Sequence, residues 1–207
     1  DIKRIQTIKE LATAALFRDD YFLDLFVLKG GNAMELVYGV SDRPSMDIDV
    51  SMPVDFNDAE LEEIQKRLDK SFEKTFAPEG YIVFDTRFEK TPREVSKEFK
   101  NFWGGYTYSF KLITSKKRDE VLERWNHLSP EEQMEKLRRN AEVVNSNNGK
   151  TFKVDISSFE YCDPKIPFDL PDGVTIFVYS PAMLVYEKLR AICQQTEEYV
   201  TQLKRKV

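Results

Sequence analysis

The sequence predicts an α+β fold, a mixed β-sheet with helices packed on it. Segments typical of helices and of strands follow one another without a regular βαβ repeat, which argues against a purely parallel sheet. Hydrophobic residues make up 41% and aromatic residues 13% of the 207 residues, enough for a packed core. This length suits one domain, or one domain with an appendage.

The N-terminal part predicts a helix, a strand, a short helix and a second strand. Apolar residues at helical spacing indicate a helix over residues 2–18. A short apolar strand over 25–29 leads into a two-glycine turn and a short helix over 32–38. Pro44 prevents that helix from continuing, and a strand is predicted over 46–52.

The middle of the chain predicts a helix, two paired strands and a helical segment. Leucine, isoleucine and phenylalanine at helical spacing predict a long amphipathic helix over 58–76. Strands over 81–88 and 104–113 are predicted to pair with each other. Helices are predicted over 116–143, with a break where Ser129 caps the second helix and a proline takes its first turn.

The C-terminal part predicts two strands and a final helix. The strands lie over 151–159 and 174–179, and the proline-rich segment between them, 162–173, predicts a loop. Ser180 precedes a proline and opens the last helix, which has apolar residues at Met183, Leu184, Leu189 and Ile192.

Charge and composition exclude several classes of protein. The net charge is −5, so a contact with nucleic acid would need a local basic patch. No apolar run approaches the roughly 20 residues that span a bilayer, and we expect no membrane partner. Cys162 and Cys193 lack metal-like spacing, so two reduced thiols in a cytoplasmic protein are favoured over a disulfide.

One region combines basic and aromatic residues in a way that could suit RNA. An ordinary surface of strands and helices is the better-supported interpretation, given the acidic net charge. The region comprises Lys97, Lys100, Lys111, Lys116, Lys117 and Arg118, with Trp103, Tyr106 and Tyr108 interleaved.

Two aspartates in the predicted strand over 46–52 need an explanation, because Asp is a poor strand former. Asp47 and Asp49 flank Ile48 and therefore point to the same face, with β-carbons roughly 7 Å apart. Two carboxylates at this spacing repel each other unless a cation lies between them, and Mg²⁺ prefers such oxygen ligands. The alternative is an edge strand whose charges discourage aggregation.

A glycine pair precedes the aspartates. Gly30 and Gly31 follow a predicted strand and open a helix, where backbone can approach a ligand closely and N–H groups favour phosphate. A glycine pair alone is common in turns. Followed at short range by two aspartates, it predicts a phosphate site beside a metal site, as phosphoryl or nucleotidyl transfer requires.

Further charged residues are weaker candidates. Asp155 lies within a predicted strand and could be a third acid, while Asp85 is a less favoured competitor. Glu187, Lys188 and Arg190 lie close together on the last helix, and their spacing alone favours a solvated helix face.

The segment "FVLKGGNAMELVYG…RPSMDIDVSM" resembles the first motif of the AbiEii/MenT-type nucleotidyltransferase toxin family, and "YEKLRAI" resembles its later helix. The resemblance extends from about residue 1 to 207, but only these two blocks are specific. It implies the mixed sheet and surrounding helices of the DNA polymerase β-like nucleotidyltransferase fold, with additional helices. We expect a nucleotidyltransferase domain over 1–179 with 116–143 inserted, and a C-terminal helical region beginning over 180–207.

The resemblance implies roles for the first motif. Gly30 and Gly31 match the family's glycine turn, and Asp47 and Asp49 match its metal-binding acids. The family usually has Thr or Ser after the glycines, where this chain has Asn32. Because the Asn side chain can still form hydrogen bonds, we expect altered phosphate contacts.

Four other positions also match family residues. Ser45 matches a serine two residues before the first acid, and Arg43 matches a spacer arginine; both are predicted to help bind the nucleotide. Lys188 matches the helix lysine that engages the nucleotide phosphates. Asp155 is a looser match to a third catalytic and metal-binding acid on a later strand.

The resemblance therefore implies a Mg²⁺-dependent enzyme with two metal ions, which transfers NMP from an NTP to an acceptor such as tRNA. It also implies a toxin of a type IV toxin–antitoxin or abortive-infection system, with a cognate antitoxin. The family has a further aspartate after the lysine helix that "TEEYVTQLKRKV" does not match, and truncation is the favoured explanation. The alternatives are a nucleotide- or protein-binding module with a degenerate site, and a phosphotransferase on the same scaffold.

Overall fold

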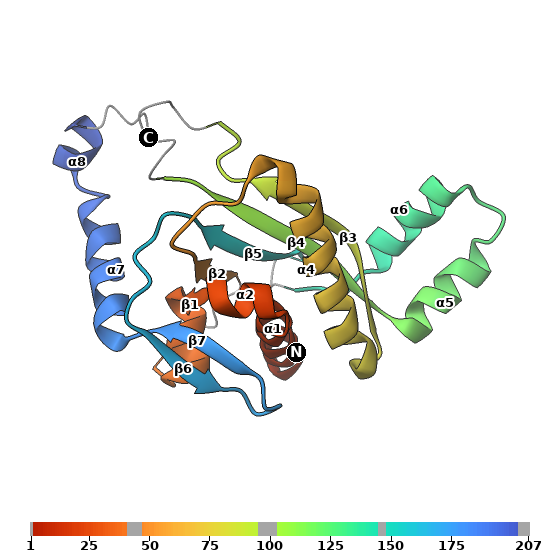
Figure 1. The fold of residues 1–207 in the computed structure, drawn as a ribbon. Helices are drawn as coiled ribbons and strands as arrows, with labels where there is room; N and C mark the ends of the chain where they lie inside the picture. The colour runs from red at the N-terminus through yellow and green to blue at the C-terminus, as the bar shows by residue number, and fades with distance from the viewer. Residues whose placement is uncertain (1, 41–46, 95–102, 145–147, 203–207) are drawn as a thin grey trace.

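A mixed β-sheet forms the centre of the protein in a computed structural model, which describes residues 2–40, 47–94, 103–144 and 148–202. Within this part of the chain the sheet has seven strands in the order β3-β4-β5-β2-β1-β7-β6 (Figure 1). The strands are β1 (Val27–Lys29), β2 (Ile48–Ser51), β3 (Tyr81–Lys90), β4 (Gly105–Thr114), β5 (Phe152–Ser157), β6 (Lys165–Asp169) and β7 (Thr175–Tyr179).

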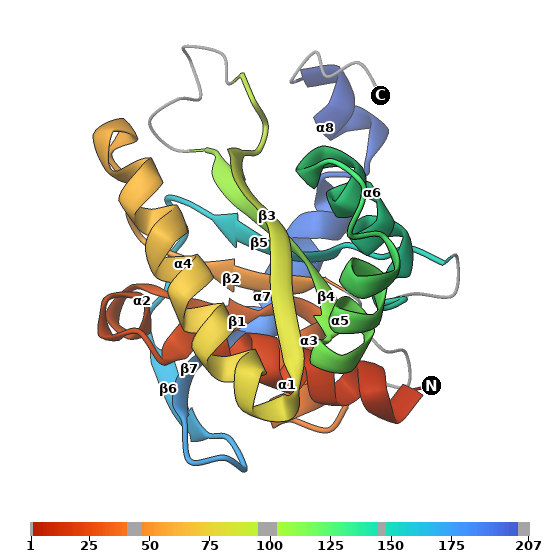
Figure 2. The same ribbon diagram turned by 90° about the vertical axis from the view of Figure 1, so that its right-hand side faces the viewer.

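Helices cover the sheet and extend beyond it. Figures 1 and 2 show α1 and α4 packed side by side over the sheet, while α7 lies away from them, beside β1 and β7. The α-helices are α1 (Ile2–Phe17), α2 (Asp20–Leu25), α3 (Gly30–Asn32), α4 (Leu61–Phe76), α5 (Ser115–Arg124), α6 (Pro130–Asn140), α7 (Pro181–Cys193) and α8 (Glu197–Gln202). A π-helix, η1 (Ala33–Val37), continues α3, and two 3₁₀ turns, η2 (Asp58–Glu60) and η3 (Ala77–Glu79), flank α4.

The strand pairing confirms a mixed sheet. Strand β2 runs antiparallel to β1 and parallel to β5, so the two strands that carry Asp49 and Asp155 are direct neighbours. Strands β3 and β4 pair antiparallel, as the sequence predicts, and β4 also pairs with β5. The α+β class is therefore confirmed.

The hydrophobic core occupies the face of the sheet that α1 and α4 cover. Alternate residues of the central strands, among them Val50, Val154 and Ile156, are fully buried there. Helix α4 contributes Ile64, Leu68 and Phe72, the residues whose spacing predicts an amphipathic helix. The intervening strand residues point to the opposite face, and it is there that the polar residues of β2 and β5 lie.

The predicted inserted segment forms a helical hairpin. Helices α5 and α6 lie beyond the ends of β3 and β4 and protrude from the sheet in Figure 1. Ser129 caps α6 through a capping box with Glu132, and Pro130 occupies the first turn, as predicted. A small second cluster of Ile113, Val121 and Leu137 packs the hairpin against β4.

Two features of the fold differ from the prediction. Residues 165–169 form strand β6 and not a loop; Pro167 is tolerated because β6 is the edge strand. The short helix α2 was not predicted, and Asp19 caps it by accepting a hydrogen bond from the Tyr21 N–H. On α7, Leu184 is buried, whereas Leu189 and Ile192 are exposed.

No helix in the described part of the chain is long and apolar enough to cross a membrane. Cys162 is buried, Cys193 is exposed, and both are free thiols.

Candidate active site

A row of polar side chains crosses four neighbouring strands on the face opposite the core. In the strand register, Lys29 pairs with Asp49, Asp49 with Asp155, and Asp155 with Thr107. Paired residues on neighbouring strands point to the same face. Two carboxylates therefore lie side by side, with an amine at one end of the row and a hydroxyl at the other.

Thr107 orients the second acid of the row. Its hydroxyl, Oγ1, donates a hydrogen bond to Oδ1 of Asp155 at 2.7 Å, and it also contacts the Thr91 hydroxyl at 2.9 Å. One oxygen of Asp155 is thereby held in place. The hydrogen bond leaves the other carboxylate oxygen as an acceptor.

Asp49 lies in an unfavourable environment for a carboxylate. Burial raises the pKa of the Asp49 carboxyl to about 6, against the lowering effect of Lys29. The negative charges of Asp155, Glu187 and Asp47 raise this pKa further. A cation placed among these acids would relieve both effects, because it favours the ionised form.

Gly30 makes room for the Asp49 carboxylate. It adopts a left-handed conformation with φ of +65°, which favours glycine. A β-carbon at this position would lie 2.6 Å from Oδ2 of Asp49 and 3.3 Å from its Cγ. The glycine turn therefore brings backbone up against the acid.

Asn32 holds the main chain at the first aspartate, Asp47. It is fully buried, and its side-chain amide donates a hydrogen bond to the main-chain carbonyl of Asp47. Asp47 is exposed and lies directly before β2. The Asn32 Oδ1 atom is buried and has no hydrogen-bond partner among the described residues. The amide of Asn32 thus fixes the backbone that carries Asp47.

The short helical segment after the glycines is anchored at two points. The buried amine of Lys9 on α1 donates to Oε2 of Glu35 at 2.6 Å. The Tyr38 hydroxyl donates to the main-chain carbonyl of Tyr179 on β7 at 2.8 Å. These contacts hold the glycine turn between α1 and the sheet.

Asp49 and Asp155 are the neighbouring acids that could hold a metal ion at this site. Across the described residues, no group of three or more His, Cys, Asp or Glu side chains could hold a metal ion by itself. Mg²⁺ is commonly bound by only one or two carboxylates together with substrate phosphates. The neighbouring Asp49 and Asp155 carboxylates could supply such a donor set, and an ion between them would offset the burial and the nearby negative charge that raise the pKa of Asp49.

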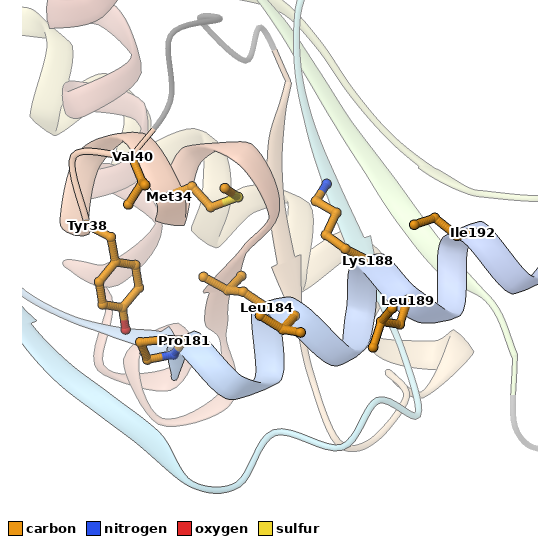
Figure 3. A pocket seen from close by; sticks show the side chains of 9 residues that line it. Met34, Tyr38, Val40, Pro181, Leu184, Lys188, Leu189 and Ile192 are labelled. Atoms are coloured by element: carbon orange, nitrogen blue, oxygen red, sulfur yellow. The ribbon is translucent and has the colours of Figure 1, made fainter.

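Helix α7 places Lys188 beside η1, the helical segment that follows the glycine turn. An apolar pocket of about 470 Å³ lies between α7 and η1, and Lys188 is one of its lining residues. Figure 3 shows the Lys188 side chain on the side of α7 that faces Met34. Leu184 lies about one turn earlier on the same helix. The preceding residue, Glu187, forms an ion pair with Lys29 at 3.3 Å. The helix lysine and the row of acids are therefore linked through adjacent residues.

Several residues considered in the sequence lie elsewhere. Arg43 and Ser45 are outside the described residues, so their predicted roles remain predictions. Asp85 is not near the acids of β2 and β5: it accepts hydrogen bonds from Lys111 on β4 and Arg138 on α6. Its competing assignment as the third acid is therefore wrong.

The basic and aromatic region does not present its tyrosines to a ligand. Tyr106 and Tyr108 are buried, and their hydroxyls donate to Asp55 at 2.9 Å and Asp69 at 2.8 Å. Trp103 is exposed, while Lys97 and Lys100 lie outside the described residues. Stacking of bases on Tyr106 and Tyr108 is therefore excluded.

Three residues near the site were not assigned roles from the sequence. Lys29 and Thr107 join the row only through strand register, and Glu187 meets Lys29 only through packing of α7. One signal was available for Lys29: a lysine at the end of an apolar strand, directly before two glycines, needs a partner for its charge. Nothing in the sequence pairs Thr107 with Asp155.

The mixed sheet flanked by helices is consistent with an α+β nucleotidyltransferase fold. A family model described as "Nucleotidyl transferase AbiEii toxin, Type IV TA system" matches residues 14–203. The chain therefore belongs to the AbiEii nucleotidyltransferase toxin family. A search of curated proteins found no significant match. Membership suggests a toxin of a type IV toxin–antitoxin system, with nucleotidyltransferase activity and an antitoxin partner.

Proposed function

We propose that this protein is a Mg²⁺-dependent nucleotidyltransferase, which transfers NMP from an NTP to an RNA acceptor such as the 3′ end of tRNA and releases pyrophosphate. The observation that carries the proposal is the pairing of Asp49 with Asp155 on neighbouring parallel strands, directly beside the Gly30 turn. Acids next to a backbone turn that can approach phosphate suit chemistry at a phosphorus atom. We place the reaction in the cytoplasm, with a cognate antitoxin as its partner.

Each residue of the site has a distinct role in this proposal. Asp47, Asp49 and Asp155 supply carboxylate oxygens for up to two Mg²⁺ ions. When bound, such ions neutralise phosphate charge and stabilise the attacking and leaving oxygens of an in-line displacement. Asp155, oriented by Thr107, also accepts a hydrogen bond from the attacking hydroxyl.

The remaining candidates hold the substrate. The Lys188 amine neutralises the triphosphate, while the backbone of Gly30 and Gly31 lies against it. Arg43 and Ser45 contribute further phosphate contacts, as the family resemblance implies. Asn32 acts through its hydrogen bond to the Asp47 carbonyl, because it is fully buried.

A labelling experiment tests the reaction. The protein is incubated with Mg²⁺, total tRNA and each NTP labelled at the α-phosphate, and transfer is read as radioactive RNA with release of pyrophosphate. Asp49→Asn should abolish labelling because it removes the charge that a metal ion needs. Asp119→Asn, an exposed aspartate on α5, is the matched control and should label RNA like the wild type.

Other results would identify the rival functions. Transfer of label from the γ-position, with none from the α-position, would identify a phosphotransferase. No transfer from either position to RNA or protein, with NTP binding retained, would identify a nucleotide-binding module with a degenerate site. The two variants also detect contamination by another transferase, because labelling by a contaminant would be the same in Asp49→Asn as in Asp119→Asn.

A further inference from the structure

Lys29 is a buried lysine at the junction between the row of acids and helix α7. Its side chain is 8% exposed. The amine, Nζ, donates a hydrogen bond to the Ser157 hydroxyl at 3.0 Å and lies 3.3 Å from Oε1 of Glu187 and 3.9 Å from Oε1 of Glu160. A buried ammonium group needs such partners, because its desolvation is otherwise strongly unfavourable.

Helix α7 makes few apolar contacts that could hold it in place. Among its described residues only Leu184 is buried, and Ser180 caps the first turn. Val185, Leu189 and Ile192 are each more than half exposed, so the second half of the helix lacks an apolar anchor. Polar contacts must therefore fix its position.

Among the residues that the structure describes, two polar contacts link this second half of α7 to the rest of the protein. Arg190 forms a bidentate pair with Glu160, with both N···O distances 3.0 Å. Glu187 reaches the buried Lys29, as described above. Its other oxygen, Oε2, is buried and has no hydrogen-bond partner among the described residues, so Lys29 carries most of the compensation for this acid. Glu160 contacts both cations and connects the two pairs.

We infer that Lys29 is a positioning residue for the nucleotide: by holding Glu187, it fixes the turn of α7 that carries Lys188 relative to the acids of β2 and β5. Lys188 directly follows Glu187, so any displacement of the Glu187 backbone moves the Lys188 side chain with it. The inference rests on the proposed role of Lys188 in binding the triphosphate. Lys29 itself does not touch the nucleotide.

Removal of the Lys29 charge has a specific consequence. In Lys29→Met, Glu187 and Glu160 would face each other without the cation between them, close to Asp49. Their repulsion would move α7 outward, because few apolar contacts oppose it. Lys29→Arg retains the charge and should restore the contact, while Glu187→Gln should weaken it without placing an unpaired lysine among apolar residues.

Hydrogen–deuterium exchange measures the effect on α7 without requiring any ligand. Lys29→Met should accelerate exchange of the 181–193 amides and leave those of 61–76 in α4 unchanged; Lys29→Arg should restore protection. Lys153→Met, at an exposed lysine on β5, two strands away from β1, is the matched control and should match the wild type in both helices. Glu187→Gln should reproduce the acceleration, which guards against a general loss of folding in Lys29→Met.

Calorimetry then measures the effect on nucleotide binding in Mg²⁺. Lys29→Met should weaken NTP binding by about ten-fold, a change of about 1.4 kcal/mol. The double variant Lys29→Met/Lys188→Ala should bind no more weakly than Lys188→Ala alone, because Lys29 acts through Lys188. A purely structural role for Lys29 would give additive losses.

Each outcome decides the inference. Unchanged α7 exchange in Lys29→Met would overturn it, as would faster exchange with unchanged NTP affinity, or additive losses in the double variant. Faster α7 exchange with non-additive loss of NTP binding would support it. If wild-type protein binds no NTP, the proposed function fails, and with it the nucleotide role of Lys29, while the exchange data still decide whether Lys29 holds α7.

Discussion

The carboxylate of Asp49 occupies the space that a side chain on residue 30 would need. Oδ2 of Asp49 lies 2.6 Å from the position of a β-carbon on Gly30, and the glycine has φ of +65°. Gly30 therefore meets two requirements at once, a left-handed backbone and a close approach to an acid. The second requirement explains why a glycine turn and an aspartate-bearing strand occur together in this sequence.

Gly30→Ala should lower the stability of the protein only modestly but abolish its Mg²⁺-dependent binding of NTP. The left-handed backbone costs roughly 1–2 kcal/mol for an alanine. The overlap with Asp49 can be relieved if the carboxylate turns away, which adds little to the loss of stability but removes the acid from its position. We expect a loss of about 1–2 kcal/mol in urea unfolding, together with loss of Mg²⁺-dependent NTP binding in calorimetry.

Gly80→Ala is the matched control for this experiment. Gly80 also has positive φ, +77°, but nothing lies within 4 Å of its β-carbon position. Its alanine variant should lose similar stability and retain NTP binding. Equal binding losses in both variants would contradict the close approach of Gly30 to Asp49 as the cause.

Asp47→Asn should remove the dependence of NTP binding on Mg²⁺. The amide keeps the shape of the side chain but not the charge that favours a divalent cation. In calorimetry, wild-type protein should bind NTP far more tightly in Mg²⁺ than in EDTA, and the variant should bind equally weakly in both. Asp172→Asn, an aspartate paired with Arg18 on another part of the surface, should behave like the wild type. Retained Mg²⁺ dependence in Asp47→Asn would remove Asp47 from the metal site.

Lys188→Ala should weaken binding of the triphosphate selectively. The side chain is exposed, so we expect unchanged thermal unfolding. Affinity for the NTP should fall by about ten-fold or more, whereas affinity for the corresponding nucleoside should change little. Lys116→Ala, an exposed lysine on α5, is the control. Equal losses for both ligands would assign Lys188 to the wall of the apolar pocket and not to the phosphates.

The local parts of the site were predictable because they follow from short-range rules. Alternation along a strand predicts Asp47 and Asp49 on one face, and two glycines after an apolar strand predict a turn into a helix. The turn and helix are confirmed, whereas β2 begins at Ile48, so Asp47 lies just before the strand. Asp155 could be proposed as a third acid, but only the parallel pairing of β2 and β5 brings it next to Asp49. That pairing joins strands about a hundred residues apart, a relationship that sequence periodicity does not contain.

The features that the sequence did not predict depend on where a segment lies in the whole fold. Pro167 argued against a strand, yet β6 forms because it lies at the edge of the sheet, where a missing N–H is tolerated. The apolar residues of α7 do not form one buried face: Leu184 is buried, whereas Leu189 and Ile192 are exposed. The contact between Lys29 and Glu187 needs the tertiary placement of α7, so neither residue could be assigned from its own segment.

Asp85 provides the clearest dependence of stability on pH. Burial alone would raise the pKa of its carboxyl, but hydrogen bonds and positive charge from Arg138 and Lys111 outweigh burial and lower the pKa to about 2. The side chain is 7% exposed and links β3 to both β4 and α6. Because the folded-state pKa lies below the ordinary Asp value, ionised Asp85 stabilises the folded protein.

This stabilisation should be complete above about pH 5 and should disappear as the pH falls from about 4 to about 2, where the carboxyl becomes protonated. Asp85→Asn should therefore reduce the free energy of unfolding by up to about 2 kcal/mol at pH 7, and by progressively less below pH 4. Asn suits this test because it tolerates the positive φ of +52° at residue 85. Asp119→Asn, at an exposed ion pair, should change the free energy of unfolding little across this pH range. Urea unfolding of the three proteins between pH 2 and pH 7 measures the difference; a constant difference between wild type and Asp85→Asn down to pH 2 would mean that the charge of Asp85 does not stabilise the contact between β3, β4 and α6.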